Sequence, residues 1–182
     1  NRGLTIVPEG LDGITSVFEF FVDSINDKLA GPDQVNFDVK GKYVQKAVSK
    51  LTEEMATTGQ NWLARGTARS ITEIILHREE HTKSLFNGLI SEGLLAEDIA
   101  YHGEGAGTED IIRFSYERFS DHLIASFLLG KHLDVENPSS SFSTGQPLHE
   151  FVKEEAVTWV SRGLIEAFSV QVPERTGKEL IE

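Results

Sequence analysis

Apolar side chains recur at three- and four-residue steps in the first third of the chain, which is the spacing of one helix face. They predict a helix that starts near residues 10–13 and ends near Leu29, and a second over about residues 40–58. Gly and Pro at residues 30–33 end the first helix, and Gly59 closes the second. The expected inward residues are Ile14, Val17, Phe18, Phe21, Ile25 and Leu29, then Val44, Ala47, Val48, Leu51 and Met55.

From residue 61 onward the predicted elements are shorter. Residues 61–65 look extended, residues 67–77 predict a helix with Ala68, Ile71, Ile74 and Ile75 on one side, and residues 82–92 predict another that Gly93 caps. The polar turn between these helices makes a helix-turn-helix. Residues 94–101 and 110–115 then carry β-compatible side chains around a Gly-rich connection, which predicts a hairpin. This order is typical of a winged helix.

The segment IIRFSYERFSDHLIASFLLGKHL, residues 111–133, turns from a short strand directly into an amphipathic helix that carries Arg118, Asp121 and His122. Residues 137–141 then read as a linker. Another helix is expected over residues 148–170, and Pro173 is expected to end it. Its expected inward residues are Phe151, Val152, Ala156, Val160, Leu164 and Phe168.

Charge and composition limit the possible partners. The chain has 17 Lys and Arg side chains and 29 Asp and Glu side chains, which give a formal net charge of −12 at pH 7. This charge disfavours binding to nucleic acid and to anionic lipid surfaces. The expected hairpin tip offers Glu104, Glu109 and Asp110 where a DNA-binding wing would place Lys or Arg. The absence of cysteine favours a reducing, cytoplasmic location, and no apolar run reaches the roughly 18 residues of a membrane span.

The sequence contains residues that bear on three catalytic patterns. The run His77-Arg-Glu-Glu80-His81 matches the H-x-x-E-H pattern of inverted zinc peptidases, with Glu154 or Glu155 as a conceivable third ligand, but it falls where the helix-turn-helix needs its turn. No phosphate-binding G-x-x-x-x-G-K-[ST] motif occurs, and residues 94–98 are too weak for a Walker B strand. Consecutive residues on a helix point about 100° apart, so Ser120, Asp121 and His122 do not make a hydrolytic triad. We expect no catalytic residues and no metal site.

The run FSYERFSDHLIA, residues 114–125, resembles the element that ends the winged-helix domain of STAND NTPases, the NACHT-like and apoptotic-ATPase-like regulatory ATPases. The resemblance is strongest to the bacterial branch that includes the AVAST (Avs) antiphage proteins. Residues 162–175 also resemble the start of the region that follows this domain, so the likeness covers about residues 60–180. The Met-His-Asp signature of some eukaryotic relatives is missing.

This resemblance implies a regulatory arm of a longer ATPase. The chain begins at Asn1 without Met, and we expect a nucleotide-binding core before it and a sensor after it. ATP or ADP with Mg²⁺ would then bind the parent protein, and no cofactor would bind this segment alone. By the same resemblance, His122 is the expected counterpart of a winged-helix histidine that reaches the nucleotide phosphates, with Arg118 beside it. Oligomerisation on activation and a role in antiviral defence are also implied.

The resulting prediction is a mainly α fold, in which helical bundle segments surround a winged-helix domain with a small β-hairpin. Residues 1–60 would form a helical linker domain, residues 61–135 the winged helix, and residues 136–182 a C-terminal helical segment leading to a further domain. The predicted function is a noncatalytic module that couples a nucleotide-binding core to a sensor. A winged-helix DNA-binding transcriptional regulator is the alternative. Arg113 and Arg118 are expected to pair with Glu117, Asp121 or that core.

Overall fold

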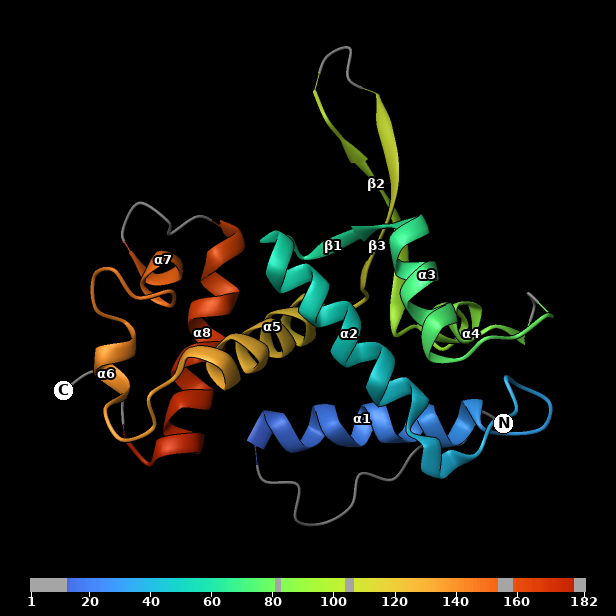
Figure 1. Ribbon diagram of the computed structural model, residues 1–182, viewed down its shortest axis with the longest axis horizontal. Helices are drawn as coiled ribbons and strands as arrows, with labels where there is room; N and C mark the ends of the chain where they lie inside the picture. Colours follow the sequence, from blue (N-terminus) through green and yellow to red (C-terminus); the bar gives the residue numbers. More distant parts are fainter. Residues whose placement is uncertain (1–12, 81–82, 104–106, 154–158, 179–182) are drawn as a thin grey trace.

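The computed structural model describes residues 13–80, 83–103, 107–153 and 159–178 (Figure 1). Helices dominate these residues, and a small three-stranded antiparallel sheet accompanies them. The predicted mainly α fold with a small β-hairpin is therefore confirmed. Residues 10–12, where the first helix was expected to start, lie outside the described residues.

Two helices, α1 (Gly13–Leu29) and α2 (Tyr43–Thr58), pack against each other in the N-terminal part. A single 3-10 turn, η1 (Val39–Gly41), precedes α2, so this helix begins a few residues later than predicted. Gly59 ends α2 as predicted, because its φ of 67° suits glycine and its N–H donates to the carbonyl of Met55.

The buried face of α1 differs from the predicted stripe. Ile25 and Leu29 are buried as expected, but Ile14 and Val17 are 37% and 42% exposed, so their inward assignment is wrong. Toward its C-terminal end the helix buries Val22, Ile25, Asn26 and Leu29. Phe18 and Phe21, which were also predicted to face inward, are partly buried and meet the ring of Phe119 in α5 edge to face.

The middle of the chain has the predicted order of strand, helix, helix and hairpin. It consists of β1 (Trp62–Ala64), α3 (Arg65–Ile75), α4 (Leu85–Ser91), β2 (Leu95–Tyr101) and β3 (Thr108–Phe114). Strand β3 lies between β1 and β2 and is antiparallel to both, with Leu63 opposite Ile112 and Leu95 opposite Phe114. Figure 1 shows the hairpin of β2 and β3 projecting away from the helices.

Helix α3 begins and ends two residues earlier than predicted, and α4 is shorter than predicted. Ser84 caps α4, because its side-chain oxygen accepts the backbone N–H of Asn87 at 3.2 Å, and the helix therefore starts at Leu85. The prediction that Ile74 faces inward is wrong, since this side chain is 85% exposed. The buried residues of α3 are Ala68 and Thr72, which lie one helical turn apart on the side that packs against α2 and α4.

Helix α5 (Glu117–His132) follows β3 directly, as the sequence predicted, and lies at the centre of the fold. It contacts α2, α8 and β3. At the junction, the buried rings of Phe114 and Phe119 meet edge to face with their centroids 5.4 Å apart. The helix buries residues around much of its circumference, which explains why it carries both apolar and polar buried side chains.

The C-terminal part corrects two predictions. Residues 137–141 do not form a plain linker, because α6 (Pro138–Ser141) is a helical turn in which Pro138 and Ser141 are buried. The helix expected over residues 148–170 is divided into α7 (His149–Val152) and α8 (Trp159–Thr176). Leu164 and Phe168 are buried as predicted, and Phe151 and Val152 are partly buried, whereas Ala156 and the Val160 side chain lie outside the described residues.

Pro173 does not end α8, contrary to the prediction, and lies inside the helix. A proline there removes one backbone hydrogen bond, at a cost of about 3 kcal/mol. Tertiary contacts on both sides of it hold the helix: Val172 is fully buried, and the side chains of Gln171 and Arg175 both bond to α5. Packing therefore outweighs the local preference of proline.

The core joins all of these parts. Buried apolar side chains from α1 through α8 form one continuous cluster among the described residues. Residues of each of the three predicted segments contribute to it, and their division into separate domains stays a prediction.

Candidate functional site

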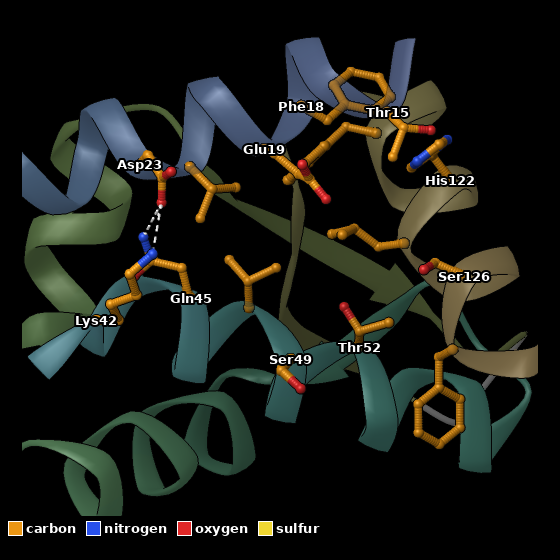
Figure 2. A pocket seen from close by; sticks show the side chains of 15 residues that line it. Thr15, Phe18, Glu19, Asp23, Lys42, Gln45, Ser49, Thr52, His122 and Ser126 are labelled. Atoms are coloured by element: carbon orange, nitrogen blue, oxygen red, sulfur yellow. Dashed lines mark hydrogen bonds and ion pairs between the residues drawn. The ribbon is translucent and has the colours of Figure 1, made fainter. Parts of the chain in front are cut away.

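A cavity of about 490 Å³ opens between α1, α2 and α5 (Figure 2). Apolar side chains from all three helices line part of it, among them Phe18, Val48 and Phe119. The polar lining residues of most interest are Glu19, Asp23, Lys42, Gln45, Thr52 and His122. Small-molecule sites typically measure about 300–1,000 Å³, so this cavity is large enough for an organic ligand.

His122, the principal residue predicted from the sequence, lies in the wall of this cavity. It is only 5% exposed, and the ring of Phe18 packs edge-on against it with centroids 5.1 Å apart. Burial lowers the pKa of His122, while Glu174 acts in the opposite direction and Arg175 in the same one. No described residue forms a hydrogen bond with its ring nitrogens. The imidazole is therefore neutral at pH 7, with one donor and one acceptor available toward the cavity.

Two other polar groups of the cavity wall are buried without partners. The Oγ1 atom of Thr52 and the Oε1 atom of Gln45 have no hydrogen-bond partner among the described residues. The side-chain amide of Gln45 donates to Asp23, so its oxygen is turned away from that carboxylate. A buried polar atom without a partner costs about 1–3 kcal/mol, and such atoms commonly mark sites for water or a ligand.

Behind His122, α5 and α8 approach each other closely at Asp121 and Gly163. Asp121 is 8% exposed, and burial, with Glu117 and Glu166 nearby, raises its pKa to about 6. A Cβ atom at Gly163 would lie 2.8 Å from Cγ of Asp121 and closer still to Oδ2. Glycine is therefore the residue that lets α8 pass this carboxylate.

Polar side chains of α8 fix it to α5 and α1. Gln171 donates to the backbone carbonyl of His122 at 2.8 Å, and Arg175 donates to the hydroxyl of Ser126 at 2.8 Å. At the other side, Thr15 of α1 donates to Glu174 at 2.7 Å. The backbone around His122 is thus held in place from the C-terminal helix.

Arg118, the other predicted site residue, is exposed on the first turn of α5. It lies one turn before His122, yet one side chain faces solvent and the other is buried. No ion pair of Arg118 occurs among the described residues. Arg113 pairs with Asp98 of β2 at 3.0 Å, so its expected pairing with Glu117 or Asp121 is not formed.

The described residues of the triad and zinc patterns in the sequence are not arranged for catalysis. The Oγ atom of Ser120 is buried without a partner, and no hydrogen bond links it to Asp121 or His122 in the described part of the chain. Helix α3 ends at Ile75, so His77 and Glu80 do not lie on the helix that the zinc pattern requires. His81, Glu154 and Glu155 lie outside the described residues, and the described ones contain no cluster suited to a metal ion.

The hairpin carries paired charges. Three of its described acidic residues, Glu97, Asp98 and Glu109, are paired with basic groups, whereas Asp110 has no ion pair with a described residue, so the hairpin offers no excess of positive charge to a phosphate backbone. Glu104 lies outside the described residues. The ion pairs are Arg65–Glu97 at 2.6 Å, Arg113–Asp98 at 3.0 Å and His102–Glu109 at 3.1 Å.

Helix α4, which would enter the DNA groove in a winged-helix DNA-binding protein, is flanked by the N-terminal helix. Lys28 of α1 forms an ion pair with Glu92 at the end of α4. A Cβ atom on Gly88 would lie 2.9 Å from the side chain of Val35, so the backbone of α4 lies directly against the segment after α1. None of the described helices is long and apolar enough to cross a membrane.

Three polar cavity residues, Thr52, Gln45 and Glu19, were missed in the sequence, although Thr52 left a signal. It lies four residues after Val48 and three before Met55, on the inward stripe of α2, where a polar side chain is out of place. Gln45 and Glu19 gave no such signal, because both lie on the polar sides of predicted helices. Comparison with protein-family models, curated proteins and solved structures gives no significant match to this chain.

Proposed function

We propose that this chain is a noncatalytic regulatory module of a larger STAND-type NTPase and that it couples a nucleotide-binding core to a sensor region in the cytoplasm. The observation that carries the proposal is the position of α5. The segment that resembles the STAND element, residues 114–125, forms the junction of β3 and α5. Because α5 contacts α2, α8 and β3, a shift of this helix would act on elements from the N-terminal, middle and C-terminal parts of the chain.

The contacts of α8 add to this support. Gln171 and Arg175 bond to α5 on either side of Pro173, and Glu174 bonds to α1. A movement imposed on α8 by a following sensor would therefore be passed to His122 and Ser126 through direct hydrogen bonds. The parent protein would hydrolyse ATP in its own core, and this chain would hold its resting state and move on activation and oligomerisation.

DNA binding is the alternative that the order of elements raises. The net charge of −12 and the ion-paired hairpin disfavour it, because phosphate contacts supply most nonspecific affinity. In the proposed role, the hairpin and α4 contact protein domains instead.

The test uses the full-length protein that contains this chain. Release of ADP carrying an N-methylanthraniloyl fluorophore is measured for the natural protein and for Arg118→Ala. Arg118 is exposed and unpaired among the described residues, so we expect folding to be kept and ADP release to change about tenfold, the effect of about 1.4 kcal/mol at one contact. Lys40→Ala, an exposed basic residue away from α5, serves as the control and should leave release unchanged.

Two results would contradict the proposal. One is the absence of ADP binding by the full-length protein, since a STAND module requires a nucleotide-binding core. The other is robust ATP turnover by the purified chain of residues 1–182, since a noncatalytic module hydrolyses nothing on its own.

A further inference from the structure

We propose that the cavity between α1, α2 and α5 is a binding site for a small organic cation, an amine with an apolar body. All of the residues that carry this inference lie in the described part of this chain. It is therefore independent of the proposed coupling to a nucleotide-binding core, and either proposal can fail without the other.

The hydroxyl of Thr52 is the first observation. Several other threonines on helices bond to carbonyls of the preceding turn, as Thr57 does to Glu53 at 2.7 Å and Thr72 to Arg69 at 2.8 Å. Thr52 is only 3% exposed and makes no such bond. Figure 2 shows its hydroxyl directed from α2 into the cavity. A ligand group that bonds to it would remove the cost of a buried, unpaired hydroxyl.

The side-chain amide of Gln45 is the second observation. Its NH₂ group donates to Asp23, and the reverse orientation would place two acceptors together, since a carboxylate has no proton to donate. The Oε1 atom is therefore turned away from Asp23, is buried and lacks a donor. An N–H group of a ligand is the natural partner of this oxygen. Thr52 and Gln45 both line the cavity from α2.

The charged residues that line the cavity determine which sign of ligand charge is favoured. Asp23 faces Lys42, whose Nζ lies 3.8 Å from its carboxylate, and the amide of Gln45. Glu19 has no ion pair or hydrogen bond with another described residue, and Figure 2 shows its carboxylate over the cavity. Two carboxylates and one ammonium therefore line the space, and the imidazole of His122 adds no positive charge. This balance attracts a cation and repels phosphates and carboxylates.

Aromatic side chains provide the apolar part of the wall. Phe18 and Phe119 lie edge to face with centroids 5.1 Å apart, and Phe127 lines the cavity from further along α5. Such rings bind an apolar body, and their faces also attract an ammonium group. An alkyl amine that carries an aromatic ring, protonated at pH 7, would match both the rings and the free carboxylate.

The test compares three probes of similar size on the full chain, namely phenethylamine, phenethyl alcohol and hydrocinnamate, by ligand-observed NMR titration. We expect saturable binding of the amine with a Kd of about 1 mM or tighter, and binding of the carboxylate at least about tenfold weaker. The affinity for phenethyl alcohol should lie between those for the amine and for the carboxylate.

Three variants separate the contributions. Thr52→Val keeps the shape and removes the hydroxyl, and we expect it to weaken amine binding about fivefold while the fold becomes no less stable. Glu19→Gln, at an exposed position, should weaken amine binding and leave alcohol binding unchanged. Asp27→Asn changes an exposed carboxylate of the same helix outside the cavity and should have no effect.

Several results would overturn the inference. They are the absence of saturable binding of the amine up to about 10 mM, equal or tighter binding of hydrocinnamate, and amine binding that neither Thr52→Val nor Glu19→Gln weakens. Self-association that both of these substitutions abolish, measured by sedimentation, would assign the cavity to a second copy of the chain and would likewise overturn it.

Discussion

The close approach of α5 and α8 gives the sharpest test of the packing. A methyl group added at Gly163 should destabilise the natural chain but stabilise a variant that lacks the Asp121 carboxylate. A Cβ atom added at Gly163 would meet the carboxylate of Asp121, with 2.8 Å to Cγ. Gly163→Ala should therefore force the two helices apart or displace the carboxylate from its buried position. When Asp121 is also replaced by alanine, the obstacle is gone.

The magnitudes follow from two opposing effects. Replacing glycine by alanine inside a helix stabilises by about 1 kcal/mol where there is room for the methyl group. Overpacking a buried contact costs about 1–3 kcal/mol. We expect Gly163→Ala alone to destabilise the chain by about 1 kcal/mol, and the same substitution in Asp121→Ala to stabilise it by about 1 kcal/mol. The coupling energy of the pair is then about 2 kcal/mol.

The assay is urea unfolding of the natural chain, both single variants and the double variant, followed by circular dichroism. The midpoints should move in opposite directions in the two backgrounds, with unchanged slopes. An equal effect of Gly163→Ala in both backgrounds would refute the reasoning, because it would mean that α8 does not pass Asp121 at this distance.

Three further predictions follow from buried and charged residues. The raised pKa of Asp121 means that its contribution to stability is complete below about pH 3.8 and is lost as pH rises through about 6. Asp121→Asn should therefore unfold at higher urea than the natural chain at pH 7 and lose this advantage toward pH 4. Phe119→Ala, at a ring that is 1% exposed, should cost about 3–5 kcal/mol in urea unfolding, and a loss below 1 kcal/mol would be too small for this core position. Duplex DNA on a column should not retain the chain at about 0.15 M salt, and salt-sensitive retention would favour the DNA-binding alternative.

Local patterns were enough to predict the order of the main elements from α1 to α5. The change from helical spacing to β-compatible runs after Gly59 predicted β1, α3, α4 and the hairpin, and the strand that leads directly into α5 was predicted from residues 111–133. Such features depend on neighbours within a few residues. They could therefore be inferred from periodicity and from the positions of glycine and proline.

Local sequence patterns could not predict the contacts between elements that are distant along the chain. Pro173 marks a helix end by local preference, yet its helix continues because Gln171 and Arg175 are held by α5. Ile74 fits an apolar stripe, yet α3 turns Ala68 and Thr72 inward instead. The outcome in each case depends on which side of a helix its neighbours cover.

The candidate site was predictable only in part. His122 was singled out from a resemblance, and the structure places it in a cavity wall rather than at an exposed face. Thr52 and Gln45 line the same cavity as His122 only because α1, α2 and α5 converge, and this convergence is set by the whole core. Arg118 remains exposed, as a contact to another domain requires.

The central claim is that α5 transmits changes between a nucleotide-binding core and the rest of the chain. Hydrogen exchange of the full-length protein, measured with ADP and then with a nonhydrolysable ATP analogue, tests it most directly. The account predicts that amides of α5 and of its partner α8 change their protection together between the two states, while those of strand β2, in the hairpin that projects from the helices, do not. Identical protection of α5 in both states would contradict the account.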